Sequence, residues 1–478
     1  MFRLPLSSCV SALDAQLKGD DIDLTAVSID TRTMKPGDVY VAIHGDQFDG
    51  HRFIDDALAK GASAIVADER YDVDAGGIAT QAGVTPVLHV ADTRKALGDI
   101  ASLWAQGHQV PTIAVTGSNG KTSVKEILAS VLGQQGPTLA TKGNLNNDIG
   151  VPLTLLSIRE EHCYAVIEMG ANHVGEISAL SALVRPDVAV VTNIGSAHIE
   201  GFGSIEAIAE AKSEIYSGVL NGGFGIVNFD DQFASQLMDA ADHLSVRTFG
   251  FNEGADVQGI EPKTGNAGGM GRSSIQMNTL EQTWSAPFSL LGRHNIMNAL
   301  AATAAAQVLD VQQDSVVAGL KAMQAVPGRL QLVIGVQSST VINDSYNANP
   351  SSVRAAIDVL ANYSGDRHLV LGNMAELGEQ ATGFHEEIGK YARKCGIDQL
   401  WTTGDLAEHA SIAFGAGRHF FTQAELLLAI ESELTSASTV LVKGSRSSKM
   451  ETIVRALTGP ETRDTSSVMI DLAEEMPS

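Results

Sequence analysis

The chain has 478 residues, enough for roughly three domains of ordinary size, and its hydrophobic content of 44% supplies material for several cores. Its formal net charge of −24 argues against a nucleic-acid-binding protein, whose contact surface would be basic. The three cysteines are far apart and lack metal-site spacing, so we expect free thiols in a reducing compartment. The N-terminal residues do not resemble a signal peptide, and no apolar run approaches membrane-spanning length, so we expect a cytoplasmic protein without membrane insertion.

The first region, residues 1–92, alternates short strand-like runs with turns. Ser28 and Arg32 frame its most distinctive stretch, in which Asp30 and Arg32 could simply pair at the surface. A strand is expected near residues 87–90. A helical pattern then begins at Asp92, where we place the first domain boundary.

The second region, residues 93–327, is organised around a strand, a glycine loop and a helix in direct succession. The loop consists of Gly117, Ser118, Asn119, Gly120, Lys121, Thr122 and Ser123. Glycines let backbone N–H groups approach a phosphate, and a helix N-terminus adds partial positive charge. Lys121 can reach the β- and γ-phosphates of ATP, and the Thr122 hydroxyl can hold Mg²⁺. Val115 stands where the general phosphate-loop pattern has its first glycine, so the generic match is incomplete.

Polar side chains follow several strands of this region. An asparagine-rich loop comes soon after the phosphate loop, where it could orient a substrate; it holds Asn144, Asn146 and Asn147. Glu168 ends an apolar strand beside the phosphate loop, a position suited to an Mg²⁺ ligand. His198 follows another buried strand, where α/β folds place their chemistry, and this favours a metal or substrate contact.

Two helices of the second region carry further candidates. Lys212 falls on the apolar face of a helix expected from residue 205 to 216. It is either a snorkelling side chain at the edge of that face or an inward-pointing lysine with a reason to be buried. Asn295 and Asn298 lie three apart near the start of an Ala-rich helix, positioned for helix capping or a contact with a nucleotide base.

The third region, residues 328–478, alternates strand and helix patterns again, which predicts βαβ units and a second parallel sheet. Three of its loops follow strands and are rich in functional residue types. They begin at Asp344, Gly372 and Lys443.

Together these stretches resemble the Mur ligase family, the ATP-dependent enzymes that add amino acids to the peptidoglycan precursor. The loop Thr116-Gly-Ser-Asn-Gly-Lys-Thr122 looks like that family's own phosphate loop. Further matching stretches are spread in order along the chain, and they begin at Lys142, Glu168, Ala197, Asp344, Met374 and Val442. The resemblance implies an α/β architecture of three domains. These are a UDP-substrate-binding domain (1–92), a central P-loop ATPase domain (93–327) and a Rossmann-like ligase domain (328–478).

Within the family, the pattern is closest to the branch whose substrates are UDP-N-acetylmuramoyl-tripeptide and D-alanyl-D-alanine. The resemblance implies that ATP phosphorylates the terminal carboxylate of the tripeptide and that the amine of the dipeptide attacks the acyl phosphate. The implied catalytic residues are Lys121, His198 and Lys212. The implied ligands of Mg²⁺, two ions in this reading, are Thr122, Glu168, His198 and Lys212. Lys212 resembles a lysine that several members use as a carbamate, and a plain ammonium is the alternative.

The resemblance also assigns binding residues. The adenine and ribose contacts of ATP are expected from Asn295, Asn298 and Asp344, and the γ-phosphate contact from Arg329. Ser28 and Arg32 resemble the UDP-contacting part of the first domain. The muramyl peptide is expected at Asn144, Asn146 and Asn147, and the dipeptide at Asn347, Asn349, Ser445 and Arg446. Because these sites span domains, closure on binding is expected.

One departure and several alternatives remain. Asn373 stands where we expect the family pattern to have Asp, which leaves the acidity of that loop open. The sister ligase that adds the third residue typically carries an Asp-Asn-Pro-Arg-type motif, which is absent here. Folylpolyglutamate synthase is a more distant alternative, and a P-loop nucleotide switch is one from another class. The third residue of the tripeptide and the general base stay open, and monomer is the default oligomeric state.

Overall fold

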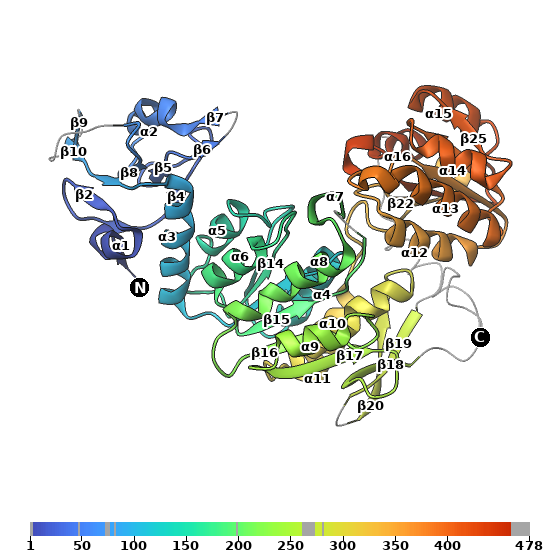
Figure 1. Cartoon of the computed structure of the whole chain (residues 1–478), viewed down its shortest axis with the longest axis horizontal. Coiled ribbons are helices and arrows are strands. Elements are labelled where there is room, and N and C mark those ends of the chain that lie inside the picture. The colour runs from blue at the N-terminus through green and yellow to red at the C-terminus, as the bar shows by residue number, and fades with distance from the viewer. Residues whose placement is uncertain are drawn as a thin grey trace.

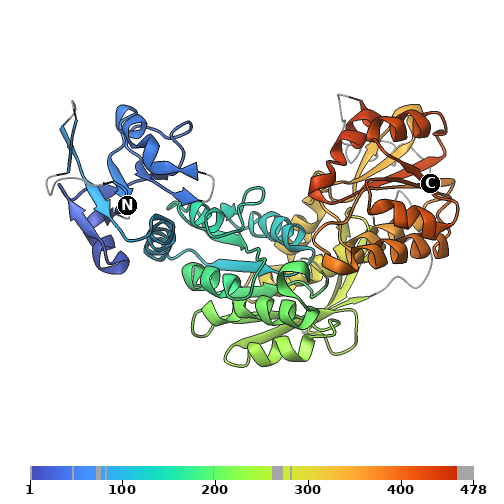
Figure 2. The same ribbon diagram turned by 45° about the horizontal axis from the view of Figure 1, so that its top comes forward.

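The computed structural model describes residues 3–45, 48–71, 77–80, 83–196, 199–260, 273–279 and 282–459. Over these residues, three main β-sheets of five, nine and six strands follow one another along the chain. Two views place the nine-stranded sheet and its helices between the other two parts of the molecule (Figures 1 and 2). The predicted α/β architecture of three domains is therefore confirmed. The predicted boundaries at residues 92 and 327 remain predictions.

The N-terminal part is built on a five-stranded sheet in which only the edge strand β2 runs antiparallel to its neighbour. In sheet order the strands are β2 (Gln16–Lys18), β11 (Val87–His89), β8 (Ala64–Ala67), β5 (Val39–Val41) and β4 (Val27–Ser28). The helices are α1 (Leu6–Leu13) and α2 (Ile54–Ala59). Three small antiparallel pairs complete it: β1 (Leu4–Pro5) with β3 (Asp23–Leu24), β6 (His44–Gly45) with β7 (Phe48–Asp49), and β9 (Ile78–Thr80) with β10 (Gly83–Thr85).

Helix α3 (Thr93–His108) joins the first two parts. It begins directly after Asp92, as predicted, because the Asp92 carboxylate accepts hydrogen bonds from the backbone N–H groups of Arg94 and Lys95. The helix contacts α1 on one side and two helices of the central part, α5 (Gly150–Leu155) and α6 (Glu176–Val184), on the other.

In the central sheet every pairing from β13 to β18 is parallel, and β19 and β20 add an antiparallel hairpin at one edge. In sheet order the strands are β13 (Thr138–Ala140), β14 (Tyr164–Glu168), β12 (Thr112–Thr116), β15 (Val188–Val191), β16 (Phe224–Asn228), β17 (Ser245–Gly250), β18 (Val257–Ile260), β19 (Ser273–Asn278) and β20 (Thr283–Phe288). The carboxyl ends of β12, β14 and β15 lie side by side, and this edge carries the candidate site.

Helices cover both faces of the central sheet with separate apolar cores. One face packs against α3, α5, α6 and α8 (Ile205–Ser213), the other against α4 (Lys121–Leu132), α10 (Arg293–Gln307) and α11 (Gln313–Ala322). The short helices α7 (Ile199–Phe202) and α9 (Ala234–Ala240) complete this part. The helix expected from 205 to 216 ends instead at Ser213 and continues as a 3₁₀ helix, Glu214–Gly218.

The C-terminal part contains the second parallel sheet that the sequence predicts, with one antiparallel edge strand, β21. In sheet order the strands are β21 (Gln331–Ile334), β22 (Thr340–Asp344), β26 (Ser438–Lys443), β23 (Asp366–Leu371), β24 (Gln399–Thr403) and β25 (Arg418–Phe420). The helices are α12 (Pro350–Ala361), α13 (Ala381–Lys394), α14 (Ala407–Phe414), α15 (Gln423–Glu431) and α16 (Glu451–Thr458). They again cover both faces of the sheet.

Candidate active site

The glycine loop between β12 and α4 is held tightly against its neighbours. Gly117 has a φ of +142°, and a Cβ there would lie 2.0 Å from the Thr192 hydroxyl oxygen. Gly120 has a φ of +82°, and a Cβ there would lie 2.4 Å from Oδ1 of Asn298. Both positions therefore need glycine for backbone conformation and for space. The loop ends at the N-terminus of α4, the geometry that favours a bound phosphate.

The Lys121 side chain folds back over this loop. Its Nζ donates a hydrogen bond to the Gly117 carbonyl at 2.7 Å. Burial lowers the pKa of the Lys121 ammonium, and the nearby carboxylate of Glu168 partly opposes this shift. The ammonium is thus poised beside the loop, where it can move onto an incoming phosphate.

Glu168 lies at the end of β14, directly beside the start of α4. Its carboxylate accepts hydrogen bonds from the Thr122 hydroxyl and from Nδ2 of Asn146, both at 2.9 Å. Only 3% of Glu168 is exposed. Mg²⁺ commonly takes one or two protein oxygens and completes its shell with phosphates and water, so the Thr122 and Glu168 oxygens fit this ion. Among the described residues, no group of three or more His, Cys, Asp or Glu side chains could hold a metal by itself.

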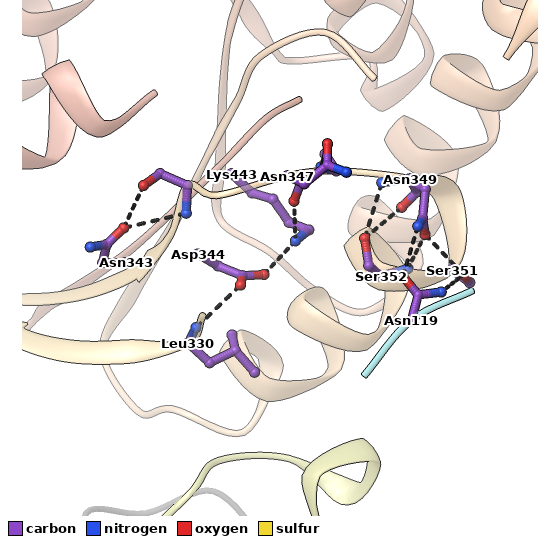
Figure 3. A network of polar contacts seen from close by, with 11 residues as sticks. Asn119, Leu330, Asn343, Asp344, Asn347, Asn349, Ser351, Ser352 and Lys443 are labelled. Atoms are coloured by element: carbon purple, nitrogen blue, oxygen red, sulfur yellow. Dashed lines mark hydrogen bonds and ion pairs between the residues drawn. The ribbon is translucent and has the colours of Figure 1, made fainter. Parts of the chain in front are cut away.

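The C-terminal part reaches this site through three charged residues, Arg329, Asp344 and Lys443. Nη2 of Arg329 donates to the Thr122 hydroxyl oxygen at 3.0 Å, although the two residues are far apart in the sequence. Asp344, at the end of β22, pairs with Lys443 at 2.5 Å and accepts a hydrogen bond from the Leu330 backbone N–H (Figure 3). Both charges of the Asp344–Lys443 pair are largely buried, so each compensates the other.

These residues surround a cavity of about 550 Å³ between the central and C-terminal parts. The predicted residues that line it are Ser118, Asn119, Gly120, Lys121, Thr122, Ser123, Asn146, Asn147, Glu168, Asn295, Asn298, Arg329, Asp344, Asn347 and Asn349. Residues predicted for ATP, the first metal and the muramyl peptide therefore share one cavity. Asn144 is not among its lining residues.

A second cavity, of about 530 Å³, lies on the other side of the 347–349 loop. All four residues predicted for the dipeptide line it: Asn347, Asn349, Ser445 and Arg446. Asn347 and Asn349 line both cavities and form a shared wall.

Lys212 points inward from α8 and is only 2% exposed. Its Nζ donates to the Ala171 carbonyl at 3.4 Å and lies 5.1 Å from the centre of the Phe202 ring. Of the two readings from the sequence, the structure favours the buried lysine over the snorkelling one. Desolvation, with the positive charge of Lys121 nearby, lowers the pKa of Lys212 to about 7. Lys212 does not itself line the first cavity, but Ala171 does.

Three further predicted residues lie apart from the two cavities or outside the described part. Ser28 and Arg32 belong to the N-terminal part, and Arg32 forms an ion pair of 2.7 Å with Asp30, the surface pairing that the sequence left open. His198 lies outside the described residues.

The sequence reasoning missed several residues of the first cavity. Lys443 opens a loop that it did identify, but the partner of this lysine, Asp344, lies 99 positions earlier. His294 lines the cavity and immediately precedes the predicted Asn295. A single histidine forms no sequence pattern that would mark it as a site residue. Asn193 holds the phosphate loop: its Oδ1 accepts from the Asn119 N–H at 3.0 Å. No pattern in the sequence distinguishes that asparagine from a turn residue.

A phosphate loop, the oxygen donors of Thr122 and Glu168 beside it and a second α/β domain that lines the same cavity are the features of a nucleotide-dependent enzyme. Comparison with known families is consistent with this class. Residues 23–105 match the family "Mur ligase family, catalytic domain", residues 115–306 match "Mur ligase middle domain", and residues 328–446 match "Mur ligase, glutamate ligase domain".

Curated relatives match over almost their full length. The UDP-N-acetylmuramoyl-tripeptide–D-alanyl-D-alanine ligase of Escherichia coli K12 is 41% identical, over 96% of this chain and 99% of the relative. The protein of the same name from Bacillus subtilis is 36% identical, over 90% and 92%. The chain therefore belongs to the Mur ligase family.

Solved structures agree with this assignment. A crystal structure of MurF from Acinetobacter baumannii has a TM-score of 0.87 at 34% identity, and the match covers 96% of this chain and 100% of the other. MurF from Thermotoga maritima in complex with ADP has a TM-score of 0.79 at 27% identity, over 90% and 96%. Folylpolyglutamate synthase of Mycobacterium tuberculosis is similar only in fold, with a TM-score of 0.62 at 18% identity over 77% and 95%.

Proposed function

We propose that this chain is an ATP-dependent ligase that joins D-alanyl-D-alanine to UDP-N-acetylmuramoyl-tripeptide. The products are UDP-N-acetylmuramoyl-pentapeptide, ADP and phosphate. The observation that carries the proposal is the pair of cavities with a shared wall, one at the phosphate loop and one lined by the four residues predicted for the dipeptide. Relatives of this name, which the chain matches over almost their full length, support the choice of substrates.

The chemistry requires activation of a poor electrophile. The γ-phosphoryl group of ATP moves to a carboxylate oxygen of the tripeptide, which gives an acyl phosphate and ADP. The dipeptide amine then attacks the acyl carbon, the C–O bond to phosphate breaks, and the nitrogen loses a proton. Lys121 and Arg329 offset phosphate charge, and the two cavities hold the acyl donor and the amine in line.

The oxygen donors of Thr122 and Glu168 would hold the first Mg²⁺, and Lys212 with His198 would serve a second. Bound Mg²⁺ supplies charge neutralisation for the phosphate oxygens. Asn295, Asn298 and Asp344 are assigned to adenine and ribose. Ser28 and Arg32 are assigned to the UDP group. Asn144, Asn146 and Asn147 are assigned to the muramyl peptide.

Lys212 is proposed to carry a carbamate. Only a neutral amine adds to CO₂, and the burial that lowers the pKa of Lys212 to about 7 makes the neutral form available near neutral pH. The neutral amine nitrogen forms a bond to the carbon of CO₂ and releases one proton to solvent, which gives a carbamate anion that could bind a cation. ¹³C nuclear magnetic resonance of the protein under ¹³CO₂ tests this: a carbamate signal that disappears in Lys212→Met is expected. An identical spectrum for both proteins would leave Lys212 as an ammonium.

We further propose that the protein works as a monomer in the cytoplasm, without membrane insertion and without nucleic acid. In the described part of the chain, no helix has both the length and the apolar character needed to cross a membrane.

Phosphate release from ATP tests the function. Release that requires both UDP-N-acetylmuramoyl-tripeptide and D-alanyl-D-alanine, with the pentapeptide as product, is expected. Release driven by a single amino acid and the dipeptide precursor would assign the chain to the sister ligase. Turnover indifferent to any acceptor would assign it to a nucleotide switch.

A further inference from the structure

Three side chains form a closed ring of hydrogen bonds between the phosphate loop and the start of α12 (Figure 3). Nδ2 of Asn349 donates to Oδ1 of Asn119 at 2.7 Å, and Nδ2 of Asn119 donates to the Ser351 hydroxyl oxygen at 3.0 Å. The Ser351 hydroxyl in turn donates to Oδ1 of Asn349 at 2.9 Å. We call these three residues the Asn119 ring. Two of its three bonds cross from the central to the C-terminal part.

Each side of the Asn119 ring is fixed independently within its own part. The Asn119 carbonyl accepts hydrogen bonds from the Thr192 hydroxyl at 2.5 Å and from Nδ2 of Asn193 at 3.0 Å. Asn349 is the N-cap of α12 and forms a capping box with Ser352. The ring therefore joins two rigid elements, so a displacement of one is transmitted to the other.

The Asn119 ring lies where the two cavities meet. Asn119 and Ser351 line only the first cavity, whereas Asn349 lines both. The loop that ends at Asn349 is the wall between nucleotide and dipeptide. The position of the dipeptide cavity relative to the phosphate loop thus depends on hydrogen bonds between two parts of the protein itself.

We infer that the Asn119 ring positions the dipeptide cavity against the phosphate loop, so that nucleotide binding and dipeptide binding strengthen each other. Asn119 and Ser351 are positioning residues in this inference, which rests on the proposed function. Coupling of this kind is reciprocal: each ligand raises the affinity for the other by the same factor. Loss of one net hydrogen bond corresponds to a change of about fivefold in that factor.

Ser351→Ala tests the inference because Ser351 does not line the dipeptide cavity. The affinity for a non-hydrolysable ATP analogue with Mg²⁺ is measured by titration calorimetry, with UDP-N-acetylmuramoyl-tripeptide present and with or without D-alanyl-D-alanine. In the unmodified protein the dipeptide is expected to tighten analogue binding about tenfold, within the usual range for coupling between two sites. Ser351→Ala is expected to reduce this factor about fivefold. The KM for the dipeptide is expected to rise accordingly, while the affinity for the ATP analogue measured without the dipeptide changes little.

One further variant controls for folding. Thr422→Ala removes the cap of α15 in the same domain, and its hydrogen bonds stay within that helix start. It is expected to retain the full coupling.

The outcomes separate the two proposals. If the unmodified protein binds nucleotide and dipeptide without coupling, or if Ser351→Ala couples them as strongly as the unmodified protein, the inference is overturned and the proposed function stands. If the unmodified protein binds no dipeptide at all, the proposed function fails and the inference fails with it.

Discussion

Lys125 is a charged residue in an unusual place, on α4 one turn after Thr122 and only 1% exposed. Its Nζ donates to the Thr141 carbonyl at 2.8 Å and pairs with the neighbouring Glu126. The Thr141 hydroxyl oxygen accepts a hydrogen bond from the Glu168 N–H at 2.9 Å. Lys125 thus fixes the strand end that holds Glu168, without lining either cavity.

Lys125→Met should therefore affect both stability and the metal requirement. A buried carbonyl that loses its partner costs about 1–3 kcal/mol in the free energy of unfolding. Because Glu168 loses its support, the Mg²⁺ concentration for half-maximal phosphate release is expected to rise several-fold. Lys95→Met is the matched control: the Lys95 side chain is 69% exposed and pairs with Asp99 at the surface. An unchanged Mg²⁺ requirement in Lys125→Met would contradict the positioning role.

Asn373 replaces the aspartate that the family pattern predicts, and the structure shows what its side chain does. Oδ1 of Asn373 accepts a hydrogen bond from the Ala407 N–H at the start of α14, 3.0 Å away. It lines neither cavity. Asparagine and aspartate both supply this acceptor, so the departure does not require a change in the site.

Asn373→Asp is expected to stabilise the protein. A carboxylate near a helix N-terminus contributes about 0.3–1 kcal/mol, and this gain should disappear at acidic pH as the carboxyl group is protonated. Asn373→Ala removes the acceptor and should destabilise instead. Urea unfolding at pH 7 and at a series of pH values below 4 measures both effects, because the gain is lost only as the pH falls through the aspartate pKa, ordinarily about 3.9. An Asn373→Asp protein less stable than the unmodified one at pH 7 would show that Asn373 has another role.

At the scale of elements, local patterns predicted β12, the glycine loop and α4 correctly, because strand, turn and helix signals all lie within neighbouring residues. The Asn119–Asn349 contact joins residues 230 positions apart, and no local pattern encodes such a pairing. The early end of α8 also depends on contacts between residues that are distant in the sequence. The carboxylate of Glu214, just after the helix, accepts from the N–H groups of Gly175 and Ser178, at the start of α6.

The β12–loop–α4 element should be intolerant of a methyl group at Gly117. In Gly117→Ala the new carbon would meet the Thr192 hydroxyl at 2.0 Å, so the loop must move. We expect phosphate release to fall more than about tenfold, with a loss of about 2 kcal/mol or more in the free energy of unfolding.

Gly222→Ala separates this clash from backbone strain. Gly222 also has a positive φ, +84°, but a Cβ there would meet no heavy atom within 4 Å. This variant should lose some stability and keep its activity. Equal losses of activity in both variants, measured side by side, would mean that backbone conformation rather than space explains the glycine.

At the scale of the whole molecule, the three parts should respond differently to acid. Burial lowers the pKa of His368 and His385, both in the C-terminal part, and of His294, which faces that part near Asp344. His385 shows a structural reason why a buried ring stays neutral. Its Nε2 accepts a hydrogen bond from the Met374 N–H at 2.9 Å, and a protonated ring could not accept this bond. Burial of a histidine depends on residues that are distant in the sequence. The lowered pKa values of these three histidines therefore could not be predicted from the sequence.

The sign of the effect follows from proton linkage. A histidine whose pKa is lowered on folding stays neutral in the folded state, while the unfolded chain takes up a proton as the pH falls through about 6.5. The free energy of unfolding therefore decreases as the pH falls, by up to about 1.4 kcal/mol per pH unit for each proton. The loss ends once the pH is below the folded pKa. The lowered pKa of Lys212, about 7, acts instead between neutral and alkaline pH and favours folding as the pH rises.

Between pH 7 and pH 5 the C-terminal part, which holds two of these three histidines, should consequently lose more stability than the central part, which holds His294 on α10. Scanning calorimetry should show one transition moving to lower temperature faster than the rest. Hydrogen exchange followed by mass spectrometry should assign it to β23 and α13. His385→Gln keeps a neutral acceptor for the Met374 N–H. It should remove the part of the decrease in the free energy of unfolding that comes from proton uptake by this one histidine. His173→Gln, at a side chain 69% exposed, should change nothing. A single transition with the same pH dependence in the unmodified protein, His385→Gln and His173→Gln would contradict a separate acid response of the C-terminal part.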